Sequence, residues 1–261
     1  MRVDVGLLDS LMNLVGELVL TRNQMLQCVA QHDDVVLGAA SQALDQVTSE
    51  LQDKIMRTRM QPINNIFNKF PRVVRDLSRQ LGKRVELLLT GKETELDRTI
   101  LEAMRDPFTH ILRNSIDHGI ERPEVRRAAG KSEIGQVRIA SYHEGGQVIV
   151  EVSDDGAGVD PERVKAKAIA VGLIDQAEAQ ALSDQEAVQL ITAPGLSTAE
   201  AITNISGRGV GMDVVRANVE KIGGNLDIAS ELGRGSTIRI RIPLTLAIIP
   251  ALMVGAGGQL F

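Results

Sequence analysis

The stretch from His110 to Gly119, HILRNSIDHG, decides the fold, because it crowds two imidazoles, an amide and a carboxylate onto a segment with helical character. Residues three or four positions apart share one face of an α-helix. His110, Asn114 and either Asp117 or His118 should therefore line up along one side. The pattern predicts a helix face that handles charge, and the plainer alternative is a polar face in solvent.

Around this stretch, the spacing of apolar residues predicts one long helix over residues 94–119, followed by strands that alternate in polarity. Two of these strands are separated by the turn-like EGG and form a β-hairpin. Helices and strands in this order predict an α+β protein whose main part is a layered α/β sandwich with a mixed, largely antiparallel sheet. The expected strands are 85–89, 136–141, 147–153, 225–229 and 236–242, and further helices are expected at 161–171 and 210–222, separated by a long polar segment that ends at residue 206.

The first 60 residues predict a helical hairpin. Its first helix carries two neighbouring apolar stripes, and its second helix, expected from about Ser41, carries one narrower stripe. A hairpin of this size has too little core to be stable alone. We therefore expect two copies to form a four-helix bundle in a homodimer, with packing on the downstream domain as the alternative. The stripes are Leu7, Leu11, Leu14 and Leu18; Leu8, Met12, Val15 and Val19; and Leu44, Val47, Leu51 and Ile55. Pro62 is placed to start the next helix, whose stripe runs from Ile63 to Leu81.

The composition excludes several classes of protein. The 261 residues carry a net charge of −5 and only 2% aromatic residues, so neither a positive field nor a stacking surface for nucleic acid is expected. Cys28 is the single cysteine, which excludes an intrachain disulfide. Asp4 interrupts the N-terminus, so no signal peptide is expected and a cytoplasmic location is predicted. The apolar run 243–261 contains Pro243 and Pro250, which favours buried strands over membrane insertion.

Two glycine-rich stretches flank the predicted helices. Asp154 ends the strand at 147–153 and is followed by Gly156 and Gly158. Its carboxylate could accept a hydrogen bond from an exocyclic amino group beside a flat ring, which would select adenine. The alternative is a turn with a solvated aspartate. The second stretch, GRGVG at residues 207–211, opens a helix, so its N–H groups could cradle a phosphate; a plain turn is the alternative.

The amide oxygen of Asn114 suits magnesium, which takes hard oxygen ligands and keeps several waters and phosphate oxygens. His110 and His118 together suggest zinc, but they are eight residues apart and no third soft ligand is evident. Zinc is therefore disfavoured.

The order H-x-x-x-N, D-x-G-x-G, G-x-G-x-G resembles the pattern of the GHKL ATP-binding superfamily. Within it, DPFTHILRNSIDHGIE, SDDGAGVD, PGLSTAE, SGRGVGMDVV and IPLTLAII closely resemble the CheA family of chemotaxis histidine kinases. LLDSLMNLVGELVLTRNQM resembles the dimerisation domain of that family. The resemblance covers essentially the whole chain.

The resemblance implies three regions: a dimerisation hairpin at 1–60, an ATP-binding kinase domain at 61–245, and the start of an SH3-like regulatory domain at 246–261. It implies an ATP-dependent protein-histidine kinase that uses Mg2+ and phosphorylates a histidine on a separate phosphoacceptor domain. His32 and His143 lie in apparent loops and do not fit the acceptor role. The implied partners are a second copy of the chain, that acceptor domain, a coupling protein and chemoreceptors through the regulatory domain, and response regulators.

The resemblance also implies roles for single residues. His110 would assist or orient the acceptor, Asn114 would bind magnesium with His118 as a second contact, and Asp154 would read adenine with support from Thr237. Arg163 and Lys167 are candidates for phosphate contacts, with a solvated basic face as the alternative. The remaining implied nucleotide contacts are Asp117, Gly156, Gly158, Ser197, Thr198, Gly207, Arg208, Gly209, Val210, Gly211 and Met212.

One position departs from the family pattern. The segment Gly195-Leu196-Ser197-Thr198 carries Leu196 where the family usually has phenylalanine. Leucine can still fill an apolar hollow, although with less area. How firmly this segment closes over a nucleotide therefore stays open at the level of sequence.

Overall fold

The computed structural model describes residues 5–29, 35–196, 211–244, 255–256 and 259–260. Contacts between Cα atoms divide the chain into two compact units, Met1–Gln61 and Pro62–Phe261. In the described part of the chain, no helix is both long and apolar enough to cross a membrane.

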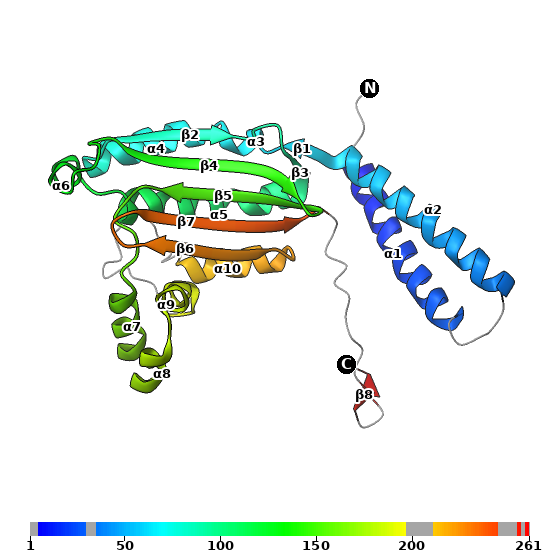
Figure 1. Cartoon of the computed structure of the whole chain (residues 1–261). Helices are drawn as coiled ribbons and strands as arrows, with labels where there is room; N and C mark the ends of the chain where they lie inside the picture. The colour runs from blue at the N-terminus through cyan, green and yellow to red at the C-terminus, as the bar shows by residue number, and fades with distance from the viewer. Residues whose placement is uncertain (1–4, 30–34, 197–210, 245–254, 257–258, 261) are drawn as a thin grey trace. The chain divides into compact units, whose positions relative to one another are not determined.

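The first unit is a helical hairpin of α1 (Val5–Val29) and α2 (Val35–Arg59) (Figure 1). One predicted stripe of α1 is inside the hairpin, since Met12, Val15 and Val19 are buried. The predicted stripe of α2 is buried only in part: Leu44 and Ile55 are partly buried, whereas Val47 is 63% exposed and Leu51 is 40% exposed. The buried positions of α2 are Ser41, Thr48 and Met56, and the small side chains of the first two let the helices approach closely there. The helix also begins at Val35, earlier than expected.

The helix expected after Pro62 is divided. The strand β1 (Met60–Pro62) is followed by the short α3 (Asn64–Phe67) and then by α4 (Phe70–Leu81). Pro71 lies in the first turn of α4, where a proline restricts the backbone to helical φ without losing a hydrogen bond. Gly82, with a φ of 65°, ends α4 in the left-handed conformation.

A five-stranded sheet forms the centre of the second unit, in the order β2-β4-β5-β7-β6. Only β2 and β4 are parallel, while β4–β5, β5–β7 and β6–β7 are antiparallel. The predicted mixed, largely antiparallel sheet is therefore confirmed. Gly145 and Gly146 both have positive φ and close the β4–β5 hairpin at the predicted EGG turn. The strands are β2 (Val85–Thr90), β4 (Gly135–Glu144), β5 (Gln147–Asp154), β6 (Asn225–Glu231) and β7 (Gly235–Pro243).

Helices α4, α5 (Arg98–Asn114) and α10 (Met212–Lys221) cover one face of this sheet (Figure 1). The apolar side chains of these helices and of the inner sheet face form one continuous core around Phe67, Phe108 and Ile111. The helix expected over 94–119 differs at both ends. The short strand β3 (Glu95–Asp97) precedes it, and Asp97 caps α5 by accepting a 2.7 Å hydrogen bond from the Thr99 amide. After Asn114 the chain continues as a π-helix, Ser115–Gly119, and then as α6 (Pro123–Ala128).

The segment expected to be irregular between residues 171 and 206 contains two further helices. These are α8 (Gln176–Ala181) and α9 (Asp184–Gln189), which follow α7 (Pro161–Ala170) and lead into a 3-10 turn, Leu190–Thr192. Each begins with a capping box, Asp175 with Glu178 and Ser183 with Glu186. Near the C-terminus, β8 (Gly255–Ala256) and β9 (Gln259–Leu260) pair antiparallel.

Candidate functional site

Asp154 lies at the end of β5 and faces the π-helix that follows α5. Its carboxylate accepts a 3.1 Å hydrogen bond from the Gly156 amide. Burial raises the pKa of Asp154, while hydrogen bonds from the Gly156 backbone, the Ser115 side chain and the Ser236 backbone act against that rise. A strand end and a helix far apart in sequence therefore meet at one carboxylate.

Gly156 leaves no room for a side chain at this contact, and Gly119 leaves little. A Cβ on Gly156 would lie 2.1 Å from the carbonyl oxygen of Gly119, and a Cβ on Gly119 would lie 3.1 Å from the Asp154 carboxylate. Gly158 has a φ of 71°, which side chains rarely adopt, and a Cβ there would lie 2.2 Å from the Glu231 carbonyl. The loop after Asp154 is thus packed backbone to backbone against its neighbours.

The π-helix changes the predicted helix face. The Ile120 amide donates a 2.7 Å hydrogen bond to the carbonyl of Ser115, five residues earlier, so the 3.6-residue period does not continue to His118. His110 and Asn114 are partly buried, while the His118 side chain is 59% exposed and that of Asp117 is 40% exposed. Single π-turns within helices are frequent at functional sites.

Lys83, which follows α4, stabilises the same turn. Its ammonium donates to the carbonyls of Ile116 at 2.9 Å and Asp117 at 2.6 Å. Burial lowers the pKa of Lys83, and the charge of Asp117 acts against that fall. The Lys83 ammonium thus donates hydrogen bonds to two carbonyls that backbone N–H groups would satisfy in an uninterrupted α-helix.

Asn114 links α5 to the start of α10. Its Nδ2 lies 3.3 Å from the sulfur of Met212, which is the first residue of α10, and the buried Gly211 is the N-cap. Among the residues that the structure describes, none donates a hydrogen bond to the amide oxygen of Asn114. That oxygen is therefore free to serve as the hard ligand that magnesium prefers.

His110 lies in the same neighbourhood. Burial lowers its pKa, the charges of Arg113 and His118 lower it further, and Asp213 near the start of α10 acts in the opposite direction. The imidazole is therefore neutral at neutral pH. Within the described ranges, there is no cluster of three or more His, Cys, Asp or Glu side chains that could hold a metal ion.

Of the other predicted nucleotide contacts, some lie within the described residues and some do not. Thr237 lies on β7 opposite Ser153, one residue from the Asp154–Ser236 pair. Arg163 is exposed and Lys167 is half-buried on α7, beyond the Asp154 loop. Ser197, Thr198, Gly207, Arg208, Gly209 and Val210 lie outside the described residues.

Leu196 is 1% exposed and packs with Val164 and Ala168 of α7. The leucine that replaces the family's phenylalanine therefore does fill an apolar hollow. It anchors the end of the described segment 171–196 on α7.

Several residues at the site were not predicted. Ser115, Gly119 and Lys83 contact Asp154 or its supporting turn, and Arg126 and Lys131 bind the loop that follows Asp154. Ser115 and Gly119 belong to the stretch HILRNSIDHG, so its concentration of polar side chains was the available signal. Arg126 and Lys131 gave none, because basic residues in a polar segment usually lie on the surface.

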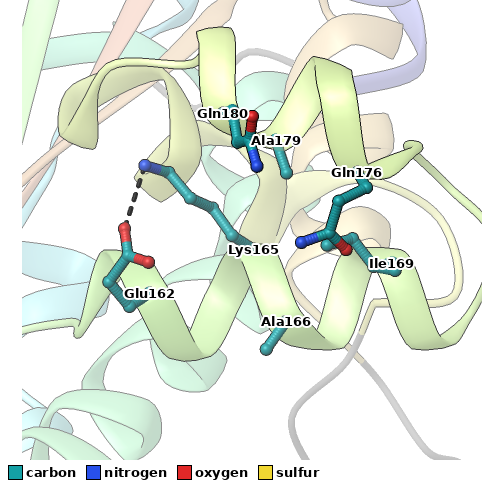
Figure 2. A pocket seen from close by; sticks show the side chains of 7 residues that line it. All are labelled: Glu162, Lys165, Ala166, Ile169, Gln176, Ala179 and Gln180. Atoms are coloured by element: carbon teal, nitrogen blue, oxygen red, sulfur yellow. Dashed lines mark hydrogen bonds and ion pairs between the residues drawn. The ribbon is translucent and has the colours of Figure 1, made fainter.

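A separate hollow of about 390 Å³ lies between α7 and α8, as Figure 2 shows. Its lining includes Lys165 and Glu162, which form a 3.0 Å ion pair, so the two charges partly neutralise each other. None of its lining residues was predicted to contact nucleotide, and we assign the candidate site to Asp154 and Asn114 instead.

Comparison with known families agrees with this geometry. Residues 103–246 match the family "Histidine kinase-, DNA gyrase B-, and HSP90-like ATPase", and residues 1–58 match "Signal transducing histidine kinase, homodimeric domain". The chain is 50% identical to the sensor histidine kinase CheAY of Helicobacter pylori over 97% of its length, and 45% identical to the chemotaxis protein CheA of Bacillus subtilis over 97%. It spans 33% and 38% of those relatives.

Among solved structures, the histidine kinase AdeS of Acinetobacter baumannii aligns with 87% of this chain and 95% of its own, at 15% identity and a TM-score of 0.43. The fold, the site and the matched families define the class: the chain belongs to the histidine kinase-, DNA gyrase B- and HSP90-like ATPases. Within that class it is a member of the CheA family of chemotaxis histidine kinases.

Proposed function

We propose that this chain is the dimerisation and catalytic core of a chemotaxis histidine kinase, which binds Mg-ATP and transfers its γ-phosphoryl group to a histidine of a separate phosphoacceptor domain. The observation that carries the proposal is the meeting of three elements. Ser115 and Gly119 of the π-helix contact Asp154, and Asn114 contacts Met212 at the start of α10.

At the adenine end, Asp154 would accept a hydrogen bond from the exocyclic amino group. Gly156 and Gly158 keep side chains out of the ring's path, and Thr237 on the neighbouring strand would support the contact. The fixed position of the carboxylate, held by Gly156 and Ser115, means that little ordering is required when the base binds.

At the phosphate end, Asn114 would hold Mg2+ through its amide oxygen, with His118 as a second contact. A bound Mg2+ would neutralise charge on the phosphate oxygens. The N-terminus of α10, beginning at Gly211 and Met212, would present its first backbone N–H groups and the positive end of the helix dipole to an anion. We also propose phosphate contacts for Arg163, Lys167 and the residues of segments 197–198 and 207–210, and a nucleotide contact for Asp117.

His110 would orient the acceptor. Phosphoryl transfer depends mostly on positioning and charge neutralisation, and a neutral acceptor imidazole already offers a lone pair at neutral pH. A strong general base is therefore not required. The lowered pKa of His110 keeps its own imidazole neutral, so that it can accept or donate a hydrogen bond without adding positive charge.

The hairpin at 1–60 would dimerise. The exposed apolar residues of α1 and α2 include Leu7, Leu14, Val47 and Leu51, and they lie on the stripes that the hairpin does not bury. A second copy with the same stripes is the occupant that such a surface fits, because paired hairpins complete a four-helix bundle.

The division into 1–60, a kinase domain at 61–245 and a regulatory segment from 246 is part of the same proposal. So are a cytoplasmic location, binding of a coupling protein and chemoreceptors through the regulatory domain, and service to downstream response regulators. The similarity to CheA proteins supports these proposals.

The test is to mix the chain with an isolated phosphoacceptor domain and ATP labelled at the γ-phosphate. Label on the acceptor histidine supports the proposal, and the chain alone should take up none. Tight ATP binding without transfer would indicate a nucleotide-sensing scaffold. ATP hydrolysis without an acceptor would indicate an ATPase of the gyrase type.

A further inference from the structure

Two largely buried cations lie behind the Asp154 loop and have no part in the proposed chemistry. The Arg126 side chain, on α6, is 1% exposed, and that of Lys131, three residues after the end of α6, is 19% exposed. Both bind Glu121 at 2.9 Å, which neutralises one of the two charges. Arg126 also donates to the Asp155 carboxylate at 2.7 Å and to the carbonyl of Ser132 at 2.6 Å.

The remaining hydrogen bonds of this pair go to the main chain of the loop itself. The carbonyl of Asp155 accepts from Arg126 at 3.1 Å and from Lys131 at 3.0 Å, and the carbonyl of Gly156 accepts from Lys131 at 2.7 Å. Two consecutive peptide groups are therefore held from the same side by cationic donors, which form stronger hydrogen bonds than neutral ones do.

The N–H group of each of these two peptides also donates a hydrogen bond at the site. Because a peptide is planar, holding the Asp155 carbonyl also orients the Gly156 N–H, which donates to Asp154 Oδ1 at 3.1 Å. Holding the Gly156 carbonyl orients the Ala157 N–H, which donates to the Gly119 carbonyl at 2.9 Å. One peptide thus fixes the carboxylate, and the next fixes the loop to the end of the π-helix.

We propose that Arg126, Lys131 and Glu121 form a clamp of positioning residues, which sets the orientation of the Asp154 carboxylate and through it the selection of adenine. The inference rests on the proposed role of Asp154 in nucleotide binding. The clamp does not touch the nucleotide; it acts through the peptide groups on either side of Gly156.

The negative charge of Glu121 is stabilised by the two cations of the clamp. Burial acts to raise the pKa of Glu121, but hydrogen bonds from Lys131 and Arg126 outweigh it and lower the pKa. Glu121 is therefore ionised and can hold both cations at once. An uncharged side chain at position 131 would leave the Gly156 carbonyl without its cationic donor, and one at position 126 would leave the Asp155 carbonyl with Lys131 as its remaining cationic donor.

The test compares the affinities of the full chain and its Lys131→Met variant for ADP and for IDP, which lacks the exocyclic amino group. We expect Lys131→Met to weaken ADP binding about tenfold, the effect of losing a charged hydrogen bond, and to leave IDP binding within about twofold. The preference for ADP therefore falls. Lys131→Arg, which keeps the cation, should restore most of it.

The matched control is Arg127→Met, which removes an equal charge from a neighbouring, exposed side chain that pairs with Glu133. It should change neither affinity. If Lys131→Met does not fold, as judged by circular dichroism, Glu121→Gln gives the same test with a smaller expected loss for ADP.

An unchanged preference for ADP in a folded variant would overturn the clamp, and so would equal losses for both nucleotides, which would indicate a structural role only. These results leave the proposed function standing. An unaltered chain that binds neither nucleotide, or both equally, would refute the role of Asp154 and the clamp together.

Discussion

Replacing Asp154 with asparagine should separate binding from stability. The carboxylate is buried and receives hydrogen bonds from the Gly156 amide and the Ser115 side chain. Asparagine keeps the shape and one acceptor oxygen, but its amide nitrogen would meet the adenine amino group donor to donor. Leaving a buried polar partner unpaired costs about 1–3 kcal/mol, so we expect ADP affinity to fall by about 5- to 150-fold.

Stability should respond in the opposite direction. Because folding raises the pKa of Asp154 above its ordinary value of 3.8, the folded chain binds this proton more tightly than the unfolded chain does. The contribution of Asp154 to the free energy of unfolding therefore falls as the pH rises from 3.8 through the folded pKa. At neutral pH the folded protein carries the cost of a buried carboxylate, which asparagine removes.

The assay is isothermal titration with ADP and Mg2+ at neutral pH, combined with the unfolding midpoint of the nucleotide-free protein. Asp154→Asn should bind weakly and unfold at the same or a higher temperature. The control is Asp76→Asn, which removes an exposed carboxylate from α4 and should bind normally. Normal ADP affinity in Asp154→Asn would refute the assignment, and loss of binding through unfolding would refute the reasoning about stability.

Asn114→Ala should abolish Mg2+-dependent transfer while circular dichroism shows an intact fold; unchanged activity would remove Asn114 from the metal site. Because the pKa of His110 is lowered, the folded chain loses stability as the pH falls through about 6.5, and His110→Gln should reduce that loss between pH 7.5 and 5.5; identical profiles would contradict it. Leu14→Asp should yield monomers by light scattering, whereas Val125→Asp, at a similarly exposed site, should not; a dimeric Leu14→Asp chain would exclude this surface. Leu196→Ala should cost about 2–5 kcal/mol in denaturant unfolding, and an unchanged midpoint would show that its packing on α7 contributes little.

Local patterns predicted most of the fold. Alternating polarity and the Gly145-Gly146 turn predicted the β4–β5 hairpin, and apolar stripes predicted α1 and α4. The two capping boxes beginning at Asp175 and Ser183 were present in the sequence, yet their helices are only six residues long and too short for a recognisable stripe.

Features that depend on distant partners could not be predicted in the same way. The π-helix at Ser115–Gly119 is held by Lys83, more than thirty positions away, and no local pattern indicates it. The apolar stripe of α2 was predicted from its residues, but which positions face α1 depends on tertiary packing: Val47 and Leu51 are exposed, whereas Ser41 and Thr48, which composition does not mark as interior positions, are buried.

The same distinction holds at the site. The spacing of Asp154, Gly156 and Gly158 was interpreted as leaving room for a flat ring, but it did not indicate that Gly156 packs against the Gly119 carbonyl, where a Cβ would lie 2.1 Å from the oxygen. The buried Arg126, in contrast, became apparent only when α6 and the Asp154 loop were seen together.

The most direct test of the account is a crystal structure of this chain with a non-hydrolysable ATP analogue and Mg2+. The account predicts the adenine amino group within hydrogen-bonding distance of the Asp154 carboxylate, the metal at the Asn114 amide oxygen, and the phosphates before the N-terminus of α10. A nucleotide bound elsewhere, with Asp154 and Asn114 contacting neither base nor metal, would contradict it.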